Sequence, residues 1–197
     1  MYTKALNIID FLLNHRSILI FMNRLRYPIC LFLLILLLFY IKRSLLLPGF
    51  LISLFGELIQ IWSFASLDKN RKLATKGLYS LTRNPMYIGR FFLLAGLLIL
   101  INKIWIILLF TVLYYFYTSN RVRREETKLH EIFGEEYKSY SSRVKRFMPS
   151  LNQFNVKYLM YFKWDLLVQN NGHWNLSGML FIYFFFYLFT LINPGVQ

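Results

Sequence analysis

Apolar residues gather along the chain in five long runs, separated by polar segments rich in lysine and arginine. The hydrocarbon core of a membrane contains no water that could bond to backbone groups. Helices built from such runs are suited to it because they satisfy their own backbone hydrogen bonds. The runs are Ile29–Ile41, Phe50–Phe64, Ile88–Ile101, Ile104–Tyr117 and Leu176–Ile192. The pattern therefore predicts an all-α, multi-pass transmembrane protein with about five membrane helices.

Two of these runs are separated only by Asn102 and Lys103. As one straight helix, residues 88–117 would measure about 45 Å at roughly 1.5 Å per residue. That length exceeds the ~30 Å hydrocarbon core but is too short for two full spans. We therefore expect a tight helical hairpin of two short arms, turning at Asn102-Lys103. Pro48-Gly49 is expected to form the turn into the second helix, that of the run Phe50–Phe64.

Composition supports a membrane protein, with 57% hydrophobic residues, 16% charged residues and a mean hydropathy of +0.44. A soluble domain carries about a quarter of its residues as charged side chains. The 197 residues suit a single domain, residues 1–197. Within it, residues 1–27 are expected to form an interfacial segment, and residues 176–192 an extra C-terminal transmembrane helix.

The net charge of +14 could indicate nucleic-acid binding or a membrane surface. If the five runs alternate in direction, 19 of the 23 lysines and arginines lie on the side of the N-terminus, in segments 1–27, 68–87 and 118–175. The positive-inside rule then places the N-terminus and the basic loops in the cytoplasm, and the predicted location is a bacterial inner membrane. Attraction to anionic lipid headgroups accounts for the charge, so no nucleic-acid partner is expected.

Cysteine and histidine give no sign of a metal or of a disulfide framework. Cys30 is the single cysteine of the chain. His15, His130 and His173 are far apart and lack the spacing of metal ligands. No metal is therefore expected.

The first motif with possible chemistry lies in the polar loop 72–89. Asn84 is a favourable N-cap for a helix that opens at Pro85, and the free N–H groups of such a helix end suit an anionic group. Tyr79 and Tyr87 offer flat faces to an adenine or a sulfonium. The alternative is a well-capped helix with interfacial tyrosines and no ligand.

The second motif is Arg121-Val-Arg-Arg-Glu-Glu126, in a polar stretch whose spacing continues the fourth helix to Gly134. Arg121 and Glu125 are four residues apart and share a helix face. Glu125 could accept hydrogen bonds from ribose hydroxyls or an amine, and Arg121 could orient an anionic group. The alternative is a solvated ion pair of little energetic consequence.

Glu57 lies in the middle of the second run. An ionisable residue at that depth of a membrane helix usually marks a functional site. Gln60 is close to it on the helix face. The alternative is a protonated or hydrogen-bonded packing residue at a helix contact. Both interpretations stay open, and Glu57 is kept as a candidate substrate residue.

Taken in order, these motifs resemble one family. The pattern G-x-Y-x-x-x-R-N-P-M-Y-x-G, a short hairpin, R-x-x-x-E-E-x-x-L-x-x-x-F-G-x-x-Y and a nearby V…P resembles the isoprenylcysteine carboxyl methyltransferases over about residues 50–149. Broader relatives of that family include phospholipid methyltransferases. The resemblance implies S-adenosyl-L-methionine as cofactor, bound at the cytoplasmic membrane surface. The implied acceptor is a membrane-embedded lipid or prenyl-type molecule that presents a carboxylate or an amine.

The resemblance also implies roles for individual residues. It assigns cofactor binding to Leu73, Ala74, Tyr79, Asn84, Pro85, Met86, Tyr87 and Glu125. Arg121 and Glu125 become the catalytic pair, and Arg121 and Glu57 the substrate residues. The carboxyl methyltransferases proper usually have His where this chain has Asn84, so the chain is closer to a bacterial branch of the family.

Two other classes of function stay open. Membrane sterol reductases, which use a nicotinamide cofactor, are similar in outline but carry a Lys-Pro-Asn-Tyr-like motif that is absent here. The second class is a non-catalytic membrane scaffold, which would not bind the cofactor.

Overall fold

The computed structural model describes residues 28, 32, 34–35, 37–69, 71–150 and 155–193. The chain divides into two compact units, Met1–Ile41 and Lys42–Gln197. In the first unit the described residues before Ile41 are helical. The interfacial segment expected at 1–27 and several positions of the first apolar run lie outside the described residues.

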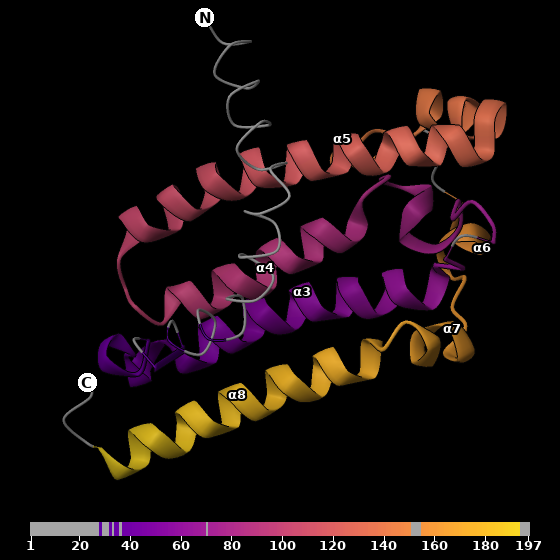
Figure 1. Cartoon of the computed structure of the whole chain (residues 1–197). Coiled ribbons are helices and arrows are strands. Elements are labelled where there is room, and N and C mark those ends of the chain that lie inside the picture. Colours follow the sequence, from indigo (N-terminus) through magenta and orange to yellow (C-terminus); the bar gives the residue numbers. More distant parts are fainter. Residues whose placement is uncertain are drawn as a thin grey trace, which may run out of the picture. The chain divides into compact units, whose positions relative to one another are not determined.

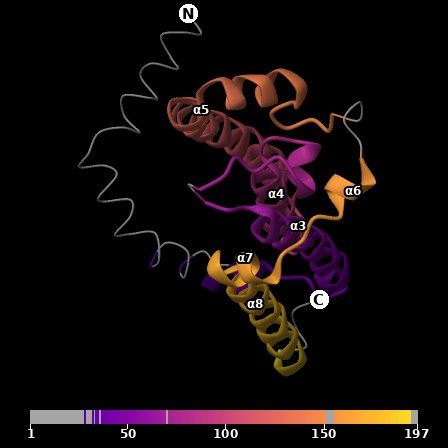
Figure 2. The same ribbon diagram turned by 90° about the vertical axis from the view of Figure 1, so that its right-hand side faces the viewer.

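The second unit consists of helices joined by short connections (Figure 1). In chain order these are η1 (Arg43–Leu45), α3 (Leu46–Ser66), η2 (Gly77–Ser80), α4 (Pro85–Ile99), α5 (Ile104–Arg143), α6 (Val156–Leu159), α7 (Trp164–Gln169) and α8 (Gly172–Ile192). The part of the chain that the structure describes contains no strand, so the predicted all-α class is confirmed. Helix α3 packs against both α4 and α8, and Figure 2 shows these helices nearly along their axes.

Among the described residues, two helical segments are long and apolar enough to cross a membrane, Arg43–Ser66 and Gly172–Ile192. Helix α4 is apolar but shorter. Large apolar side chains are exposed on α3 and α8, among them Leu47, Phe55, Phe181 and Phe184. Exposed apolar surface of this extent is typical of lipid contact, so the chain is membrane-associated through these helices.

The backbones of α3 and α4 approach each other closely at Gly56 and Gly89. A Cβ atom on Gly56 would lie 2.4 Å from the carbonyl oxygen of Gly89, and one on Gly89 would lie 2.6 Å from the carbonyl oxygen of Gly56. Small residues allow this kind of packing between membrane helices. The contact fixes the first turns of α4 against the middle of α3.

The predicted hairpin turn is confirmed. Helix α4 ends at Ile99 and α5 begins at Ile104, and Asn102 adopts a φ of 55° in the turn between them. The backbone N–H of Lys42 donates to the carbonyl of Leu100 at 2.9 Å, which ties the turn to the start of the unit.

Helix α5 is the longest element, with 40 residues. Its helical geometry is interrupted at Gly134, where φ is 50° and ψ is −123°. The prediction that the fourth helix continues to Gly134 is therefore confirmed. Glycine adopts this conformation without the steric cost of a Cβ, and the second arm leaves in a new direction (Figure 2).

Two expected helix boundaries were wrong. Helix α3 begins at Leu46, so Pro48-Gly49 lie inside its first turn and not in a turn before it. Proline is tolerated there because the first N–H groups of a helix have no intrahelical partner. Helix α8 begins at Gly172, ahead of the apolar run that starts at Leu176.

Candidate functional site

The two sequence motifs meet where the start of α4 faces the middle of α5. The Tyr87 hydroxyl donates a hydrogen bond to Oε1 of Glu125 at 2.7 Å, across 38 positions of sequence. Arg121 Nε donates to the same oxygen at 3.2 Å. The Tyr114 hydroxyl donates to the backbone carbonyl of Tyr87 at 2.7 Å, which holds the two helices together at this point.

Arg121 and Glu125 remain accessible although they are paired. Their side chains are 48% and 45% exposed. Arg121 Nη1 also donates to the Tyr117 hydroxyl at 3.1 Å, which orients the guanidinium group. An ion pair this exposed adds little to stability. Because both side chains are exposed, their charged groups are accessible to a ligand.

Tyr79 lies close to this cluster and is buried. Burial is the main reason that the pKa of the Tyr79 hydroxyl is raised, and the nearby Glu125 carboxylate and Tyr87 act in the same direction. The hydroxyl therefore stays protonated and can serve as a hydrogen-bond donor.

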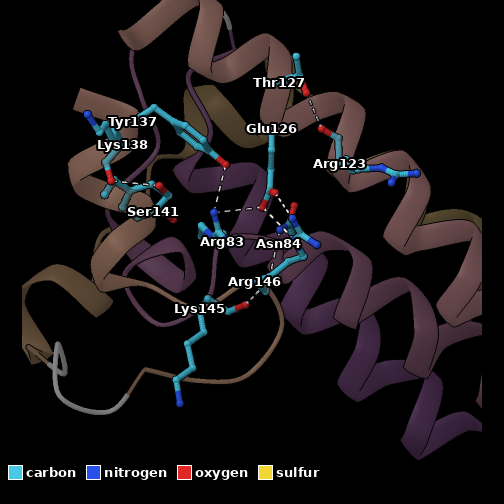
Figure 3. A network of polar contacts seen from close by, with 12 residues as sticks. Arg83, Asn84, Arg123, Glu126, Thr127, Tyr137, Lys138, Ser141, Lys145 and Arg146 are labelled. Atoms are coloured by element: carbon cyan, nitrogen blue, oxygen red, sulfur yellow. Dashed lines mark hydrogen bonds and ion pairs between the residues drawn. The ribbon is translucent and has the colours of Figure 1, made fainter. Parts of the chain in front are cut away.

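The neighbouring acid, Glu126, faces a different set of partners (Figure 3). Its Oε1 lies 3.3 Å from Arg83 Nη1 and accepts a hydrogen bond from Arg146 Nε at 3.2 Å. Arg146 Nη2 donates to the second carboxylate oxygen. Arg83 also donates to the Tyr137 hydroxyl at 3.4 Å. The Glu126 side chain is only 12% exposed, so this network joins the loop before α4 to the segment after α5 from within the protein.

Asn84 belongs to the same network and occupies the expected N-cap position of α4. Its side chain makes no capping hydrogen bond to α4. The side-chain amide instead donates to the backbone carbonyl of Arg146 at 3.2 Å, and Thr82 Oγ1 donates to the same carbonyl at 3.1 Å. The segment at Arg146 therefore passes close to the start of α4 (Figure 3).

The other residues implied for cofactor binding lie in the loop before α4 and in its first turn. Leu73 packs against a small core of Tyr137, Tyr140 and Val144 on the last part of α5 and just after it. Ala74 is partly buried in the same loop, and Pro85 is buried at the start of α4. Met86 packs against a different core, formed by Phe64, Ala65 and Leu167.

An apolar groove of about 490 Å³ runs between α4 and α5 beside Tyr87. Its lining comes from both helices and from the segment after α5. The lining residues are Tyr87, Ile88, Phe91, Thr111, Tyr114, Tyr115, Thr118, Lys145, Arg146, Phe147 and Met148. A groove of this size and character suits an elongated apolar chain.

Glu57 lines a different cavity. It is fully buried, and Gln60 Nε2 donates to its Oε2 at 3.1 Å. The structure therefore joins Tyr79, Tyr87, Arg121 and Glu125 in one cluster and leaves Glu57 outside it.

Sequence reasoning did not single out Arg83, Tyr114, Tyr117 or Arg146. The first and the last lie within the quoted R-N-P and V…P motifs, but only the fold shows that they share Glu126. The two tyrosines precede Arg121 by seven and four positions, which is helical spacing on one face of α5.

The hydrogen bond from the Tyr140 hydroxyl to the Tyr79 carbonyl, 2.7 Å long and buried, gives a simple stability test. Burial raises the pKa of Tyr140, so the hydroxyl stays a donor. We expect Tyr140→Phe to lower the free energy of unfolding by about 1–2 kcal/mol, because the Tyr79 carbonyl loses its buried partner. The melting temperature in detergent measures this loss. An unchanged melting temperature would show that the carbonyl finds another donor.

Residues 44–136 match the family model described as phospholipid methyltransferase. A protein-S-isoprenylcysteine O-methyltransferase of Schizosaccharomyces pombe is 32% identical over 82 residues, which cover 42% of this chain and 35% of the relative. For the Saccharomyces cerevisiae enzyme of the same name the identity is 36% over 88 residues, or 42% and 36% of the two chains.

The Xenopus laevis protein of that name is 29% identical over 113 residues, which cover 51% of this chain and 39% of the relative. The aligned region thus spans well under half the length of these relatives. No solved structure matches the chain. The family resemblance inferred from the motifs is confirmed.

Proposed function

We propose that this chain, a member of the phospholipid and isoprenylcysteine O-methyltransferase family, transfers a methyl group from S-adenosyl-L-methionine to a membrane-embedded lipid or prenyl-type acceptor. The observation that carries this proposal is the meeting of the two motifs at Tyr87, Arg121 and Glu125. The relatives supply the reaction class, and the cluster supplies groups that suit the cofactor.

The donor set fits S-adenosyl-L-methionine, which supplies an electrophilic methyl group when it is bound. The half-exposed Glu125 carboxylate suits ribose hydroxyls or the cofactor's ammonium group, and Tyr79 and Tyr87 offer aromatic faces. In this proposal the cofactor is bordered by the loop residues Leu73, Ala74 and Asn84 and by Pro85 and Met86 at the start of α4. Because the Asn84 and Met86 side chains contact protein, their part is to shape the loop.

The apolar groove between α4 and α5 is the proposed place for the acceptor's tail, since Tyr87 belongs to both the groove and the cluster. Arg121 would orient a carboxylate acceptor, which needs no base. An amine acceptor must lose a proton, and Glu125 is then the nearest acceptor in the cluster. In either case the protein contributes chiefly position and electrostatics.

The proposed membrane arrangement has five spans, with the N-terminus, the basic loops and the cofactor pocket on the cytoplasmic side of a bacterial inner membrane. Its support is the distribution of lysine and arginine, the hairpin of α4 and α5, and the two long apolar helices. A water-soluble cofactor and a lipid-soluble acceptor can then reach the site from separate phases.

Calorimetric titration of the purified protein with S-adenosyl-L-methionine and its demethylated product tests the proposal. We expect saturable binding that Glu125→Ala weakens about tenfold or more, because a charge-assisted hydrogen bond is lost. Tyr87→Phe is expected to weaken binding less, since it removes only the hydroxyl that orients Glu125.

Glu135→Gln is the matched control, because it removes a carboxylate that is 85% exposed and lies outside the cluster. Absence of binding to the unmodified protein would refute the proposed function. Binding of a nicotinamide dinucleotide instead would favour a reductase, and binding of neither would favour a scaffold.

A further inference from the structure

The connection between α5 and α8 carries two short helices, α6 and α7, which expose apolar side chains. Val156 begins α6 and Met160 directly follows it, and Trp164 and Val168 belong to α7. The exposed fractions of these four residues lie between 57% and 71%. Trp164 and Val168 are four positions apart and share one side of α7. The connection lies outside the segment 44–136 that matches the family, so the match does not account for this apolar surface.

Hydrogen bonds fix the connection to the end of α3. The backbone N–H of Lys163 donates to the carbonyl of Ala65 at 3.0 Å. The side-chain amide of Asn170 donates to the carbonyls of Phe64 and Leu67, at 3.0 and 2.8 Å. The last carbonyl groups of a helix have no partner within that helix, and the connection supplies donors for them. The connection is therefore held at the level where α3 ends.

Both candidate membrane helices end at this level. Helix α3 ends at Ser66 and α8 begins at Gly172, and α7 lies beside these two ends (Figure 1). The ends also pack together, because a Cβ atom on Gly172 would lie 3.1 Å from Cδ2 of Phe64. In the proposed membrane arrangement, α6 and α7 therefore lie at the level of the lipid headgroups. Tryptophan is enriched at that level, because its ring is apolar and its N–H group is polar.

Two lysines lie beside one tyrosine ring of the connection. Lys76 Nζ is 5.3 Å and Lys163 Nζ is 5.6 Å from the centre of the Tyr161 ring. Both lysines are exposed, and neither takes part in an ion pair within the described part of the chain. The loop 67–76 and the connection 155–171 together contain six basic and two acidic residues. This excess of positive charge favours contact with an anionic surface.

We propose that the α6–α7 connection, residues 155–171, lies on the anionic surface of the membrane and binds it. Trp164 enters the boundary between headgroups and acyl chains, and Lys76 and Lys163 pair with anionic headgroups. The bilayer surface is the occupant, since the exposed apolar surface continues onto α8 at Trp174, which is 68% exposed. The lipids act here as a surface and not as methyl acceptors. The proposal therefore rests on the proposed membrane arrangement but not on methyl transfer.

Quenching of tryptophan fluorescence by brominated lipids tests the proposal on the full chain in vesicles, without cofactor. The vesicles contain equal amounts of phosphatidylglycerol and phosphatidylcholine, and only one of the two is brominated in each preparation. The emission that Trp164→Phe removes is assigned to Trp164. We expect its quenching to show about a fivefold preference for phosphatidylglycerol, because a lysine near an anionic surface favours binding by roughly this factor. About 1 M salt is expected to abolish the preference by screening.

Substitutions at the two lysines then assign the charge. Lys76→Gln and Lys163→Gln are each expected to reduce the preference to about twofold, and the double variant to remove it. Lys138→Gln is the control, because it changes a lysine that is 65% exposed and paired with Glu135 on α5. It is expected to keep the full preference.

Three outcomes would overturn the proposal. The first is equal quenching of Trp164 by the two lipids in the unmodified protein. The second is a preference that persists in the double variant, since other groups would then attract the anionic lipid. The third is the absence of quenching by either lipid, because protein and not lipid would then cover this face. None of these outcomes bears on cofactor binding, which the calorimetric titration measures separately.

Discussion

Replacing Glu126 by glutamine is expected to cost about 3 kcal/mol of folding free energy, whereas the same change at Glu125 leaves folding almost unaffected. Glu126 is 12% exposed and pairs with Arg83 and Arg146. Removal of its charge leaves Arg83, only 16% exposed, without its counter-ion. Loss of one partner of a buried pair is more costly than the pair's own net contribution, because the other charge stays desolvated.

The two variants are matched controls for each other, since they remove the same group from adjacent positions of α5. Thermal unfolding in one detergent, followed by circular dichroism, gives the comparison. We expect a clear fall in melting temperature for Glu126→Gln alone, and weaker cofactor binding in a stable protein for Glu125→Gln. Equal melting temperatures for the two would contradict the network of Arg83, Glu126 and Arg146 that Figure 3 shows.

The second large effect is expected from a single methyl group at Gly56. In Gly56→Ala the new Cβ would lie 2.4 Å from the Gly89 oxygen and 2.5 Å from the Leu93 nitrogen. Both are backbone atoms and cannot rotate away, so α3 and α4 must move apart along their whole contact. We expect a loss of about 3 kcal/mol, at the upper end of the range for overpacked interiors.

Gly178→Ala on α8 is the control, since nothing lies within 4 Å of its added Cβ. Alanine is a better helix former than glycine, so this variant is expected to be as stable as the unmodified protein or slightly more so. Melting temperature and yield of monodisperse protein measure both variants. A Gly56→Ala protein as stable as Gly178→Ala would mean that the two helices do not pack this closely.

The sequence was sufficient to predict features that depend on neighbouring residues. The apolar runs predicted α3, α4 and α8, and the excess length of residues 88–117 predicted the turn at Asn102. The start of α3 was misplaced because Pro48 is compatible both with a turn and with the first turn of a helix.

Features that depend on distant residues could not be predicted in this way. Asn84 has the local signature of an N-cap, yet its amide bonds to a carbonyl 62 positions later. Glu125 and Glu126 are equivalent in a linear motif, and only the fold shows that one is half-exposed at the Tyr87 cluster and the other is enclosed by arginines. The cavity beside Glu57 is lined in part by α8. The apolar pattern of α8 predicts a membrane helix, but it does not predict which helices α8 packs against.

The shortness of α4 has a consequence for the bilayer itself. Its 15 residues measure about 22 Å at 1.5 Å per residue, against about 30 Å of hydrocarbon. In the proposed five-span arrangement, the turn at Asn102 and Lys103 would end below the far surface, and the adjoining leaflet would have to thin to reach these polar groups. Such hydrophobic mismatch favours short-chain lipids around the hairpin, and it would sort the protein into the thinner regions of a membrane.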